Sequence, residues 1–348
     1  TVDGGVTVSS TASLEIAGDI AIGAEQLTLD GDGSGNQLIS SAGVNVWGGP
    51  VTLAVGAVGI NAGAGELEIL GVIGGGFGLI QTGTGRLILA VANTFTGLLD
   101  VKEGEVRLTN NAAAGTVDGG VTVAAGASLD IAGGIAIGAE HLTLNGDGSG
   151  SQLISSAAVN TWDGPVTVTG GAAGIRTAGG EIHINGVIDG GFGLIKTGAG
   201  SLRLAGANTF TGLLDIQEGT VRLMNDSATG TVAGGVTVAS GAGIWLENNI
   251  TVGAEQLILN SGPGESIYNL GGNNTWGGPV TLAGGVVTIT SAAGDIKIDG
   301  VISGAFGLIK KGAGSLTLTG ANTFTGAVSV DQGSLVIRNN TAAGTVGG

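Results

Sequence analysis

The residues best suited to metal binding form the segment Asp30-Gly31-Asp32-Gly33-Ser34-Gly35. Oxygen-bearing side chains alternate there with glycines, as in the first half of a calcium-binding loop. The bidentate glutamate that such a loop carries at its twelfth position is missing, because Ser41 stands there. An Asx turn with glycines accounts for the same residues without a metal. We therefore expect a turn at Asp30, Asp32 and Ser34, and no cofactor other than, at most, Ca²⁺.

Three of the four tryptophans recur in one motif, Trp-x-Gly-Pro-Val-Thr. They are Trp47, Trp162 and Trp276. A stacked aromatic ring can hold a sugar, but regular recurrence beside a proline turn favours a packing role. Trp245 stands apart, because it takes a strand-middle position that Glu15 and Asp130 fill elsewhere. We expect Trp245 on the outer surface, as a contact with a glycan or a neighbouring chain, although a single exposed aromatic is usually neither.

An asparagine precedes a phenylalanine by two residues in each of three segments, all of which read Ala-Asn-Thr-Phe-Thr-Gly. The amide of a buried asparagine can satisfy backbone groups where a chain turns a corner. The pattern therefore predicts structural corner and core positions. They are Asn93, Asn208, Asn322, Phe95, Phe210 and Phe324.

The residue types needed for catalysis do not form a convincing set. The chain has two histidines, His141 and His183, and other residue types stand at the corresponding positions of similar segments elsewhere in the chain. The sequence therefore indicates neither a Ser-His-Asp triad nor a histidine metal site. A polysaccharide lyase or hydrolase built on a β-helix would need one distinctive carboxylate cluster, and none interrupts the repetition. We therefore expect no enzyme and rank such a lyase or hydrolase last.

The elements that position these residues belong to a unit of about 115 residues that is written three times. The motif Thr-Val-x-Gly-Gly begins at Thr1, Thr116 and Thr231, and a fourth copy begins at Thr345. We divide the chain into β-helix repeats 1–115, 116–230 and 231–344, with the start of a fourth at 345–348, all in one continuous solenoid. We expect the sequence to be a window from a longer array of the same repeat.

Composition limits the partners. The chain of 348 residues has 27 acidic and 11 basic residues and a formal charge of −16. This negative charge argues against nucleic acid and against anionic membrane surfaces. Apolar runs stay far below the roughly 20 residues of a membrane helix, so we expect no membrane insertion of this segment. Cysteine is absent, so the fold does not depend on disulfides.

Apolar residues alternate with period two in many short segments, such as Leu14-Glu15-Ile16 and Leu67-Glu68-Ile69. This pattern predicts strands whose apolar residues face inward and whose middle residue faces outward. Glycine-rich turns separate the strands, and no segment has a helical period with caps. Short strands, frequent corners and tandem repetition favour an all-β solenoid over a sandwich or a closed barrel. With about 20 residues per coil, each repeat would form five or six coils.

A longer pattern begins at Gly193, reading Gly-Leu-Ile-Lys-Thr-Gly-Ala-Gly-Ser-Leu-Arg-Leu, and continues from Ala205 as Ala-Gly-Ala-Asn-Thr-Phe-Thr-Gly. Related segments run over 78–108 and 307–337. The pattern resembles the autotransporter-associated β-strand repeat, also called the passenger-associated transport repeat. The resemblance implies a right-handed parallel β-helix (β-solenoid) in very large secreted or surface-exposed bacterial proteins. It also implies a role in export and folding of the passenger, and it brings no catalytic residues.

These features predict a non-catalytic structural segment of a long extracellular fibre, filament or stalk on the bacterial cell surface. The alternative is an adhesin that binds a glycan or a protein of a host or neighbouring cell. The expected partners are further copies of the same array, associated laterally or end to end, together with glycans or cell-surface proteins.

Overall fold

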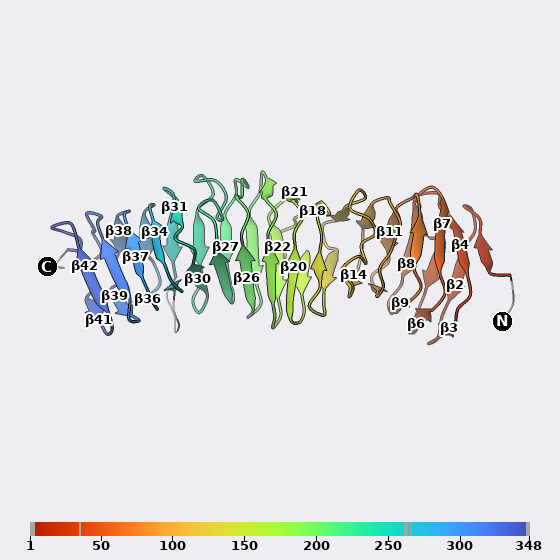
Figure 1. Ribbon diagram of the computed structural model, residues 1–348, viewed down its shortest axis with the longest axis horizontal. Helices are drawn as coiled ribbons and strands as arrows, with labels where there is room; N and C mark the ends of the chain where they lie inside the picture. Colours follow the sequence, from red (N-terminus) through yellow and green to blue (C-terminus); the bar gives the residue numbers. More distant parts are fainter. Residues whose placement is uncertain (1–3, 35, 261–263, 265, 346–348) are drawn as a thin grey trace. The chain divides into compact units, whose positions relative to one another are not determined.

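The computed structural model describes residues 4–34, 36–260, 264 and 266–345. Every regular element in this part of the chain is a β-strand, and the strands form a parallel β-solenoid of about 15 turns. The predicted fold class is therefore confirmed. Contacts divide the chain into two compact units, Thr1–Arg176 and Thr177–Gly348, and each is described by itself. Within each unit, strands that are one coil apart in the chain lie side by side as parallel arrows (Figure 1).

The strands of the first unit form four parallel ladders. The first contains β1 (Val6–Val8), β4 (Leu27–Asp30), β7 (Val51–Val55) and β10 (Ile73–Gly75). The second contains β2 (Leu14–Ile16), β5 (Leu38–Ser40), β8 (Val58–Ala62), β11 (Leu79–Thr82), β13 (Leu99–Val101), β15 (Val121–Val123), β18 (Leu142–Asn145) and β21 (Val166–Thr169). The third contains β3 (Ala21–Ile22), β6 (Val44–Trp47), β9 (Glu66–Ile69), β12 (Arg86–Leu89), β14 (Glu105–Leu108), β16 (Ser128–Ile131), β19 (Leu153–Ser155) and β22 (Ala173–Thr177). The fourth pairs β17 (Ala136–Ile137) with β20 (Val159–Trp162).

The second unit has three parallel ladders and the short strand β24 (Ile188–Gly190). One ladder contains β23 (Glu181–Ile184), β26 (Ser201–Leu204), β28 (Thr220–Leu223), β30 (Gly243–Leu246), β33 (Ile267–Asn269), β36 (Val287–Ser291), β39 (Leu308–Lys311) and β41 (Val328–Val330). Another contains β25 (Leu194–Thr197), β27 (Leu214–Ile216), β29 (Val236–Val238), β32 (Leu257–Leu259), β35 (Val280–Leu282) and β38 (Ile302–Gly304). The third contains β31 (Thr251–Val252), β34 (Asn273–Trp276), β37 (Asp295–Ile298), β40 (Ser315–Leu318) and β42 (Ser334–Ile337).

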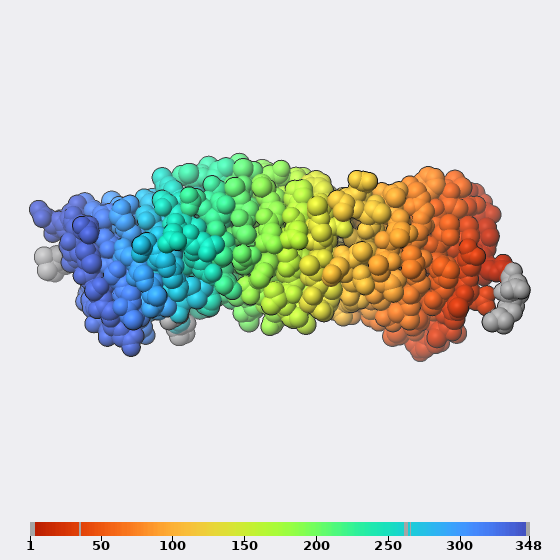
Figure 2. Space-filling view, in the orientation of Figure 1, coloured from red at the N-terminus to blue at the C-terminus, as the bar shows by residue number. Residues whose placement is uncertain are grey.

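Paired strands are separated by one coil of chain. Arg86 pairs with Glu105, 19 residues later, and Ala21 pairs with Val46, 25 residues later. Because the strands are parallel and in register, side chains of the same orientation stack in columns along each ladder. On the face that Figure 2 shows, neighbouring coils within each unit pack against one another.

The inward columns form the core. One column in the third ladder of the first unit is completely buried, and it consists of Leu67, Leu87, Val106 and Leu129. Burial of one such side chain stabilises the fold by about 1.5–3 kcal/mol relative to exposure. The alternation of apolar and polar residues therefore fixes the register, since a slip of one residue would expose a whole column.

The middle residue of each strand is predicted to face outward, and at Asp130 this outer position is covered instead of exposed to solvent. This side chain lies in the outer column next to Arg107 but is only 1% exposed. The guanidinium of Arg107 covers it, with Nη2 and Nε at 2.6 and 2.7 Å from Oδ2. The outer face of the sheet thus contains covered ion pairs as well as solvent-exposed residues.

Candidate functional site

The asparagine of each Asn-x-Phe segment joins three successive coils. In the buried side chain of Asn93, Oδ1 accepts a hydrogen bond from Ile73 N at 2.9 Å and Nδ2 donates one to Ala113 O at 2.7 Å. Asn208 and Asn322 make the equivalent two bonds. The phenylalanines two residues later, Phe95, Phe210 and Phe324, are fully buried. These six side chains are enclosed by protein.

The tryptophans of the Trp-x-Gly-Pro-Val-Thr motif are also enclosed. Trp47, Trp162 and Trp276 are at most 1% exposed. Nε1 of Trp162 and of Trp276 donates to the backbone oxygen of Glu140 and of Glu255, at 3.1 and 3.0 Å. A sugar cannot reach these rings.

The Ca²⁺ candidate forms a corner in which protein groups bind the key carboxylate. Oδ1 of Asp32 accepts hydrogen bonds from Ser34 N and Gln37 Nε2, both at 2.7 Å, and these bonds lower the pKa of Asp32. Gln37 in turn accepts a bond from Gly59 N at 2.7 Å in the next coil. Asp30 ends β4, one residue before the turn. Among the described residues, no cluster of three or more His, Cys, Asp or Glu side chains has metal-binding geometry.

Two buried lysines were not recognised from the sequence. Lys196 and Lys310 point into the core with no exposure. Nζ of Lys196 donates to the carbonyl oxygens of Thr197, Gly198 and Glu218 at 2.9, 2.7 and 3.0 Å. Burial lowers the pKa of Lys196 to about 8 and also lowers that of Lys310. Their role is to bind corner carbonyls, because no solvent or ligand reaches the ammonium groups.

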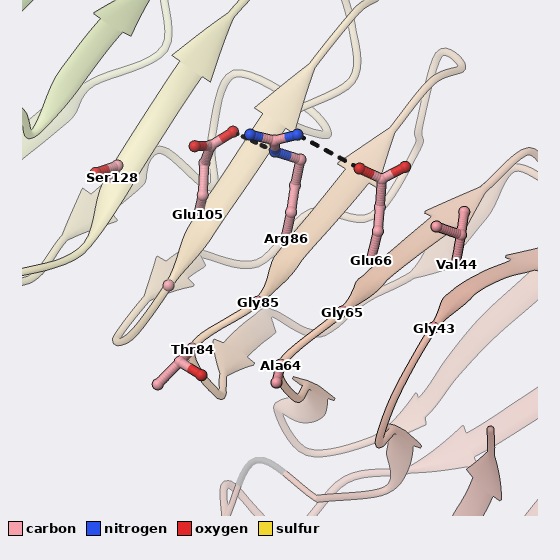
Figure 3. A pocket seen from close by; sticks show the side chains of 11 residues that line it. Gly43, Val44, Ala64, Gly65, Glu66, Thr84, Gly85, Arg86, Glu105 and Ser128 are labelled. Carbon is pink, nitrogen blue, oxygen red and sulfur yellow. Dashed lines mark hydrogen bonds and ion pairs between the residues drawn. The ribbon is translucent and has the colours of Figure 1, made fainter. Parts of the chain in front are cut away.

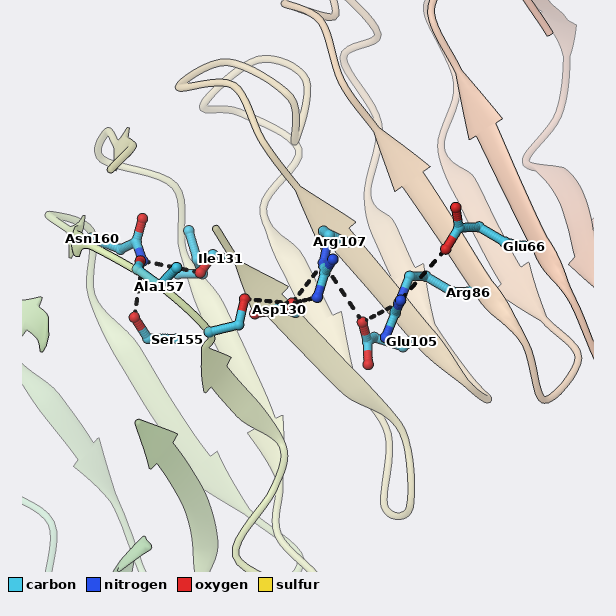
Figure 4. A network of polar contacts seen from close by, with 10 residues as sticks. Glu66, Arg86, Glu105, Arg107, Asp130, Ile131, Ser155, Ala157 and Asn160 are labelled. Carbon is cyan, nitrogen blue, oxygen red and sulfur yellow. Dashed lines mark hydrogen bonds and ion pairs between the residues drawn. The ribbon is translucent and has the colours of Figure 1, made fainter. Parts of the chain in front are cut away.

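A chain of ion pairs crosses the third ladder of the first unit (Figure 4). Arg86 lies between Glu66 and Glu105, with Nη1 to Glu66 Oε2 at 3.4 Å and Nε to Glu105 Oε1 at 2.5 Å. The hydrogen bond that Arg86 donates to Glu105 raises the pKa of Arg86. Arg107 extends the chain to Asp130, where Oδ2 also accepts a hydrogen bond from Ser156 Oγ at 3.0 Å.

Part of this chain lines a shallow cleft of about 660 Å³ in the first unit (Figure 3). Small residues form much of the cleft, including Ala64, Gly65, Thr84 and Gly85. The three charged side chains that line it are Glu66, Arg86 and Glu105, and they are paired with one another. The charges of the cleft are therefore directed at neighbouring coils of the same ladder.

Trp245 lies on the outer face of the second unit, half-buried, and it is part of an aromatic pair. The ring of Tyr268 stands at the next position of the same column, 5.0 Å away between centroids and tilted by 35°. Arg222 stands at the preceding position. Its guanidinium bridges Glu181, at 2.9 Å from Nη1, and Glu247, at 2.6 Å from Nη2.

A hollow of about 310 Å³ lies at the corner that follows these two aromatic residues in their coils. It is lined by Glu247, Asn248, Asn249, Leu270, Gly271 and Gly272. Asn248 and Asn249 adopt left-handed backbone conformations, with φ of 68° and 59°. Trp245 was singled out from the sequence, whereas Tyr268 and the hollow were not.

Comparison with known proteins identifies the repeats. The family described as Passenger-associated-transport-repeat matches residues 79–108, 194–223 and 308–337. The chain is also 30% identical over 237 residues to the "Adhesin BmaC autotransporter" of Brucella suis biovar 1 (strain 1330). This alignment covers 65% of the chain but 6% of that relative, so the chain corresponds to a small part of its length. No solved structure matches.

Each matched segment contains one Asn-x-Phe corner and the strands around it. The first match, for example, runs from β11 through β14 and includes Asn93 and Phe95. The match thus falls on the groups that hold successive coils together. No helix in the described residues is long and apolar enough to span a membrane. The three family matches, together with the autotransporter relative, identify the chain as one built with passenger-associated-transport repeats.

Proposed function

We propose that the chain is a non-catalytic structural segment of a secreted passenger, and that it serves as part of a stalk or fibre outside the bacterial cell. The observation that carries this proposal is the in-register stacking of coils within each unit. Nearly every coil is hydrogen-bonded to the coils before and after it, and side chains such as Asn208 and Lys196 add bonds across coils. The carboxylates and lysines singled out above are used in these contacts.

Mechanical pulling on single molecules tests the stalk proposal. We expect the chain to resist force and to unfold in steps close to the extended length of one coil, roughly 70 Å for about 20 residues. The physical reason is that each coil must lose a full set of backbone bonds before the next coil is exposed. Unfolding without measurable resistance would contradict a load-bearing role.

An adhesive function is the second candidate, and a specific observation favours it. The relative is named an adhesin, and Trp245 and Tyr268 form an aromatic pair on the outer face of the second unit. Stalk and adhesin are compatible, because a repeating core can present a binding surface on one repeat. The partners of this function would be glycans or proteins of another cell, and the segment itself would neither bind nucleic acid nor enter a membrane.

Bead adherence tests the adhesive function. Beads coated with the 348-residue chain should bind to cells that display the partner glycan or protein, and soluble chain should compete for the same sites. Beads coated with chain that has been denatured before coupling are the control. Equal binding by folded and denatured coatings would contradict specific adhesion.

A further inference from the structure

The corner beside Trp245 differs from its counterparts in the other two repeats. Residues 247–249 are Glu-Asn-Asn, where the first and second repeats have Ala-Gly-Asp and Ala-Gly-Gly at 17–19 and 132–134. The next coil differs as well, because Leu270 replaces Ser41 and Ser156. The backbone is shared, since the last two residues of each triplet have positive φ in all three repeats. The third repeat therefore keeps the corner but changes the side chains around it.

The backbone of this corner makes the asparagine at 248 notable. A left-handed conformation suits glycine, which stands at the equivalent positions 18 and 133. Asparagine tolerates this conformation less well than glycine, so Asn248 carries a small cost that a purely structural corner does not need. Its exposed side chain makes no hydrogen bond to the described part of the chain. Asn248 thus offers an amide to the solvent side of the hollow.

The aromatic residues follow the same pattern of replacement. Trp245 takes the place of Glu15 and Asp130, and Tyr268 takes the place of Ile39 and Ile154. Because the two rings stand on adjacent rungs, the third repeat has an aromatic surface, and each ring precedes by two residues, in its own coil, the residues that line the hollow. Tyr268 is the only tyrosine in the chain.

From this arrangement we propose that Trp245, Tyr268 and the adjoining hollow bind a neutral oligosaccharide. A sugar ring has an apolar face of C–H groups, which suits aromatic rings, and a rim of hydroxyls, which suits the amide of Asn248 and Nδ2 of Asn249. Oδ1 of Asn249 already accepts a hydrogen bond from Asn273 N at 2.8 Å. Glu247 also offers an acceptor, and Arg222 compensates its charge. The guanidinium of Arg222 is shared between two carboxylates, and the chain carries a formal charge of −16, so an anionic glycan is disfavoured. This proposal rests on the adhesive function and specifies its ligand.

Tryptophan fluorescence provides a direct test. Trp245 is half-buried whereas Trp47, Trp162 and Trp276 are enclosed, so a bound sugar should alter the emission of Trp245 alone. We expect tetrasaccharides of glucose, mannose or N-acetylglucosamine, or a member of a neutral glycan array, to give a saturable change. A tetrasaccharide of galacturonate should bind more weakly. The absence of saturable binding by every neutral probe would overturn the proposal, as would tighter binding of the galacturonate probe.

Variants taken from the other repeats separate binding from folding. Trp245→Asp reproduces the Arg–Asp pair of the second repeat, because Arg222 occupies the position of Arg107. Tyr268→Ile and Asn248→Gly likewise introduce residues that the same fold already accommodates. We expect each aromatic replacement to weaken binding by about tenfold or more, and Asn248→Gly to weaken it by about threefold. Calorimetry measures these affinities, with Glu15→Ala as the matched control in the first repeat.

Unchanged affinity in both aromatic variants would refute the site. Concentration-dependent dimerisation that buries Trp245 would also refute it, since a second copy would then be the occupant. Bead adherence distinguishes the two levels of proposal. If Trp245→Asp and Tyr268→Ile still adhere, the adhesive function is supported and the proposed glycan site is refuted. If glycans bind at Trp245 but wild-type beads do not adhere, the glycan site is supported and the adhesive function is refuted.

Discussion

Lys196 places an ammonium group inside the second unit, where three backbone carbonyls replace water as its partners. Its pKa falls to about 8 in the folded chain from 10.5, because burial disfavours the charged form. The folded chain therefore releases this proton at a lower pH than the unfolded chain. Stability contributed by this group is smallest below pH 8 and rises between pH 8 and 10.5.

Replacement by the residue of the first repeat tests this titration. Gln81 occupies the position equivalent to Lys196 and is also fully buried, so Lys196→Gln should fold. We expect the free energy of unfolding of the wild type to rise relative to the variant as pH increases from 8 to 10.5. Urea unfolding at several pH values measures the difference. Parallel pH profiles of the two proteins would show that Lys196 does not titrate in this window.

Asp147 provides the opposite case on the surface of the first unit. Its carboxylate accepts hydrogen bonds from Ser149 N and Gln152 Nε2, and Gly126 N donates to Oδ2 at 2.9 Å. The bonds from Ser149 contribute most to lowering the pKa of Asp147 to about 2. Because the folded pKa lies below the unfolded one, the stabilisation is complete above pH 4 and is lost as pH falls toward 2.

We therefore expect Asp147→Asn to lower the melting temperature at pH 7, with a deficit that shrinks between pH 4 and pH 2. Melting curves followed by circular dichroism over this range measure the effect. Asp118→Asn is the control, since Asp118 is exposed and makes no hydrogen bond to the described residues. A deficit that stays constant down to pH 2 would mean that the carboxylate charge is not the stabilising feature.

Among the structural elements, the strands connect successive coils through the hydrogen bonds of their ladders. The side chains of the corner asparagines add hydrogen bonds between coils at the corners, outside the ladders. In Asn208→Ala, Ile188 N–H and Ala228 C=O lose their bonds to the side chain in a site without access to water. A buried group left unsatisfied costs about 1–3 kcal/mol, so we expect a loss on the order of 3 kcal/mol in urea unfolding. Gln217→Ala, at an exposed position, should change stability by at most about 0.5 kcal/mol. Equal effects of the two changes would contradict the bridging role.

The strands and the three repeats could be predicted from the sequence because they depend on local alternation and on internal comparison. Leu14-Glu15-Ile16 reads as a strand without knowledge of its partners. Lys196 could not be recognised as buried, because one of its carbonyl partners, Glu218, lies in the next coil. Tyr268 was missed for the same reason, since only a register of 23 residues places it beside Trp245. Contacts between coils depend on coil length, and coil length varies from 19 to 25 residues.

For the whole chain, the regular register predicts which deletions are tolerated. Removal of residues 86–104 deletes one coil and places Glu105 at the position of Arg86. Because these two residues pair in the ladder, all later strands would keep the same side chains facing inward. Removal of residues 86–95 would instead bring the wrong residues to each face. We expect the first variant to retain a β-sheet circular dichroism spectrum and cooperative unfolding at reduced stability, and the second to lose both. Equal tolerance of the two deletions would contradict a fixed register.

The corner formed by residues 17–19, 132–134 and 247–249 also bears on how the repeats can recombine. Its backbone is the same whether the side chains are Gly-Asp, Gly-Gly or Asn-Asn at the last two positions. Unequal crossing-over between the coding repeats would therefore add, remove or exchange whole coils while preserving the fold. The surface around Trp245 and Tyr268 would be duplicated or lost together with the coils that carry it. A lineage could therefore gain or lose copies of this surface without changes to the core.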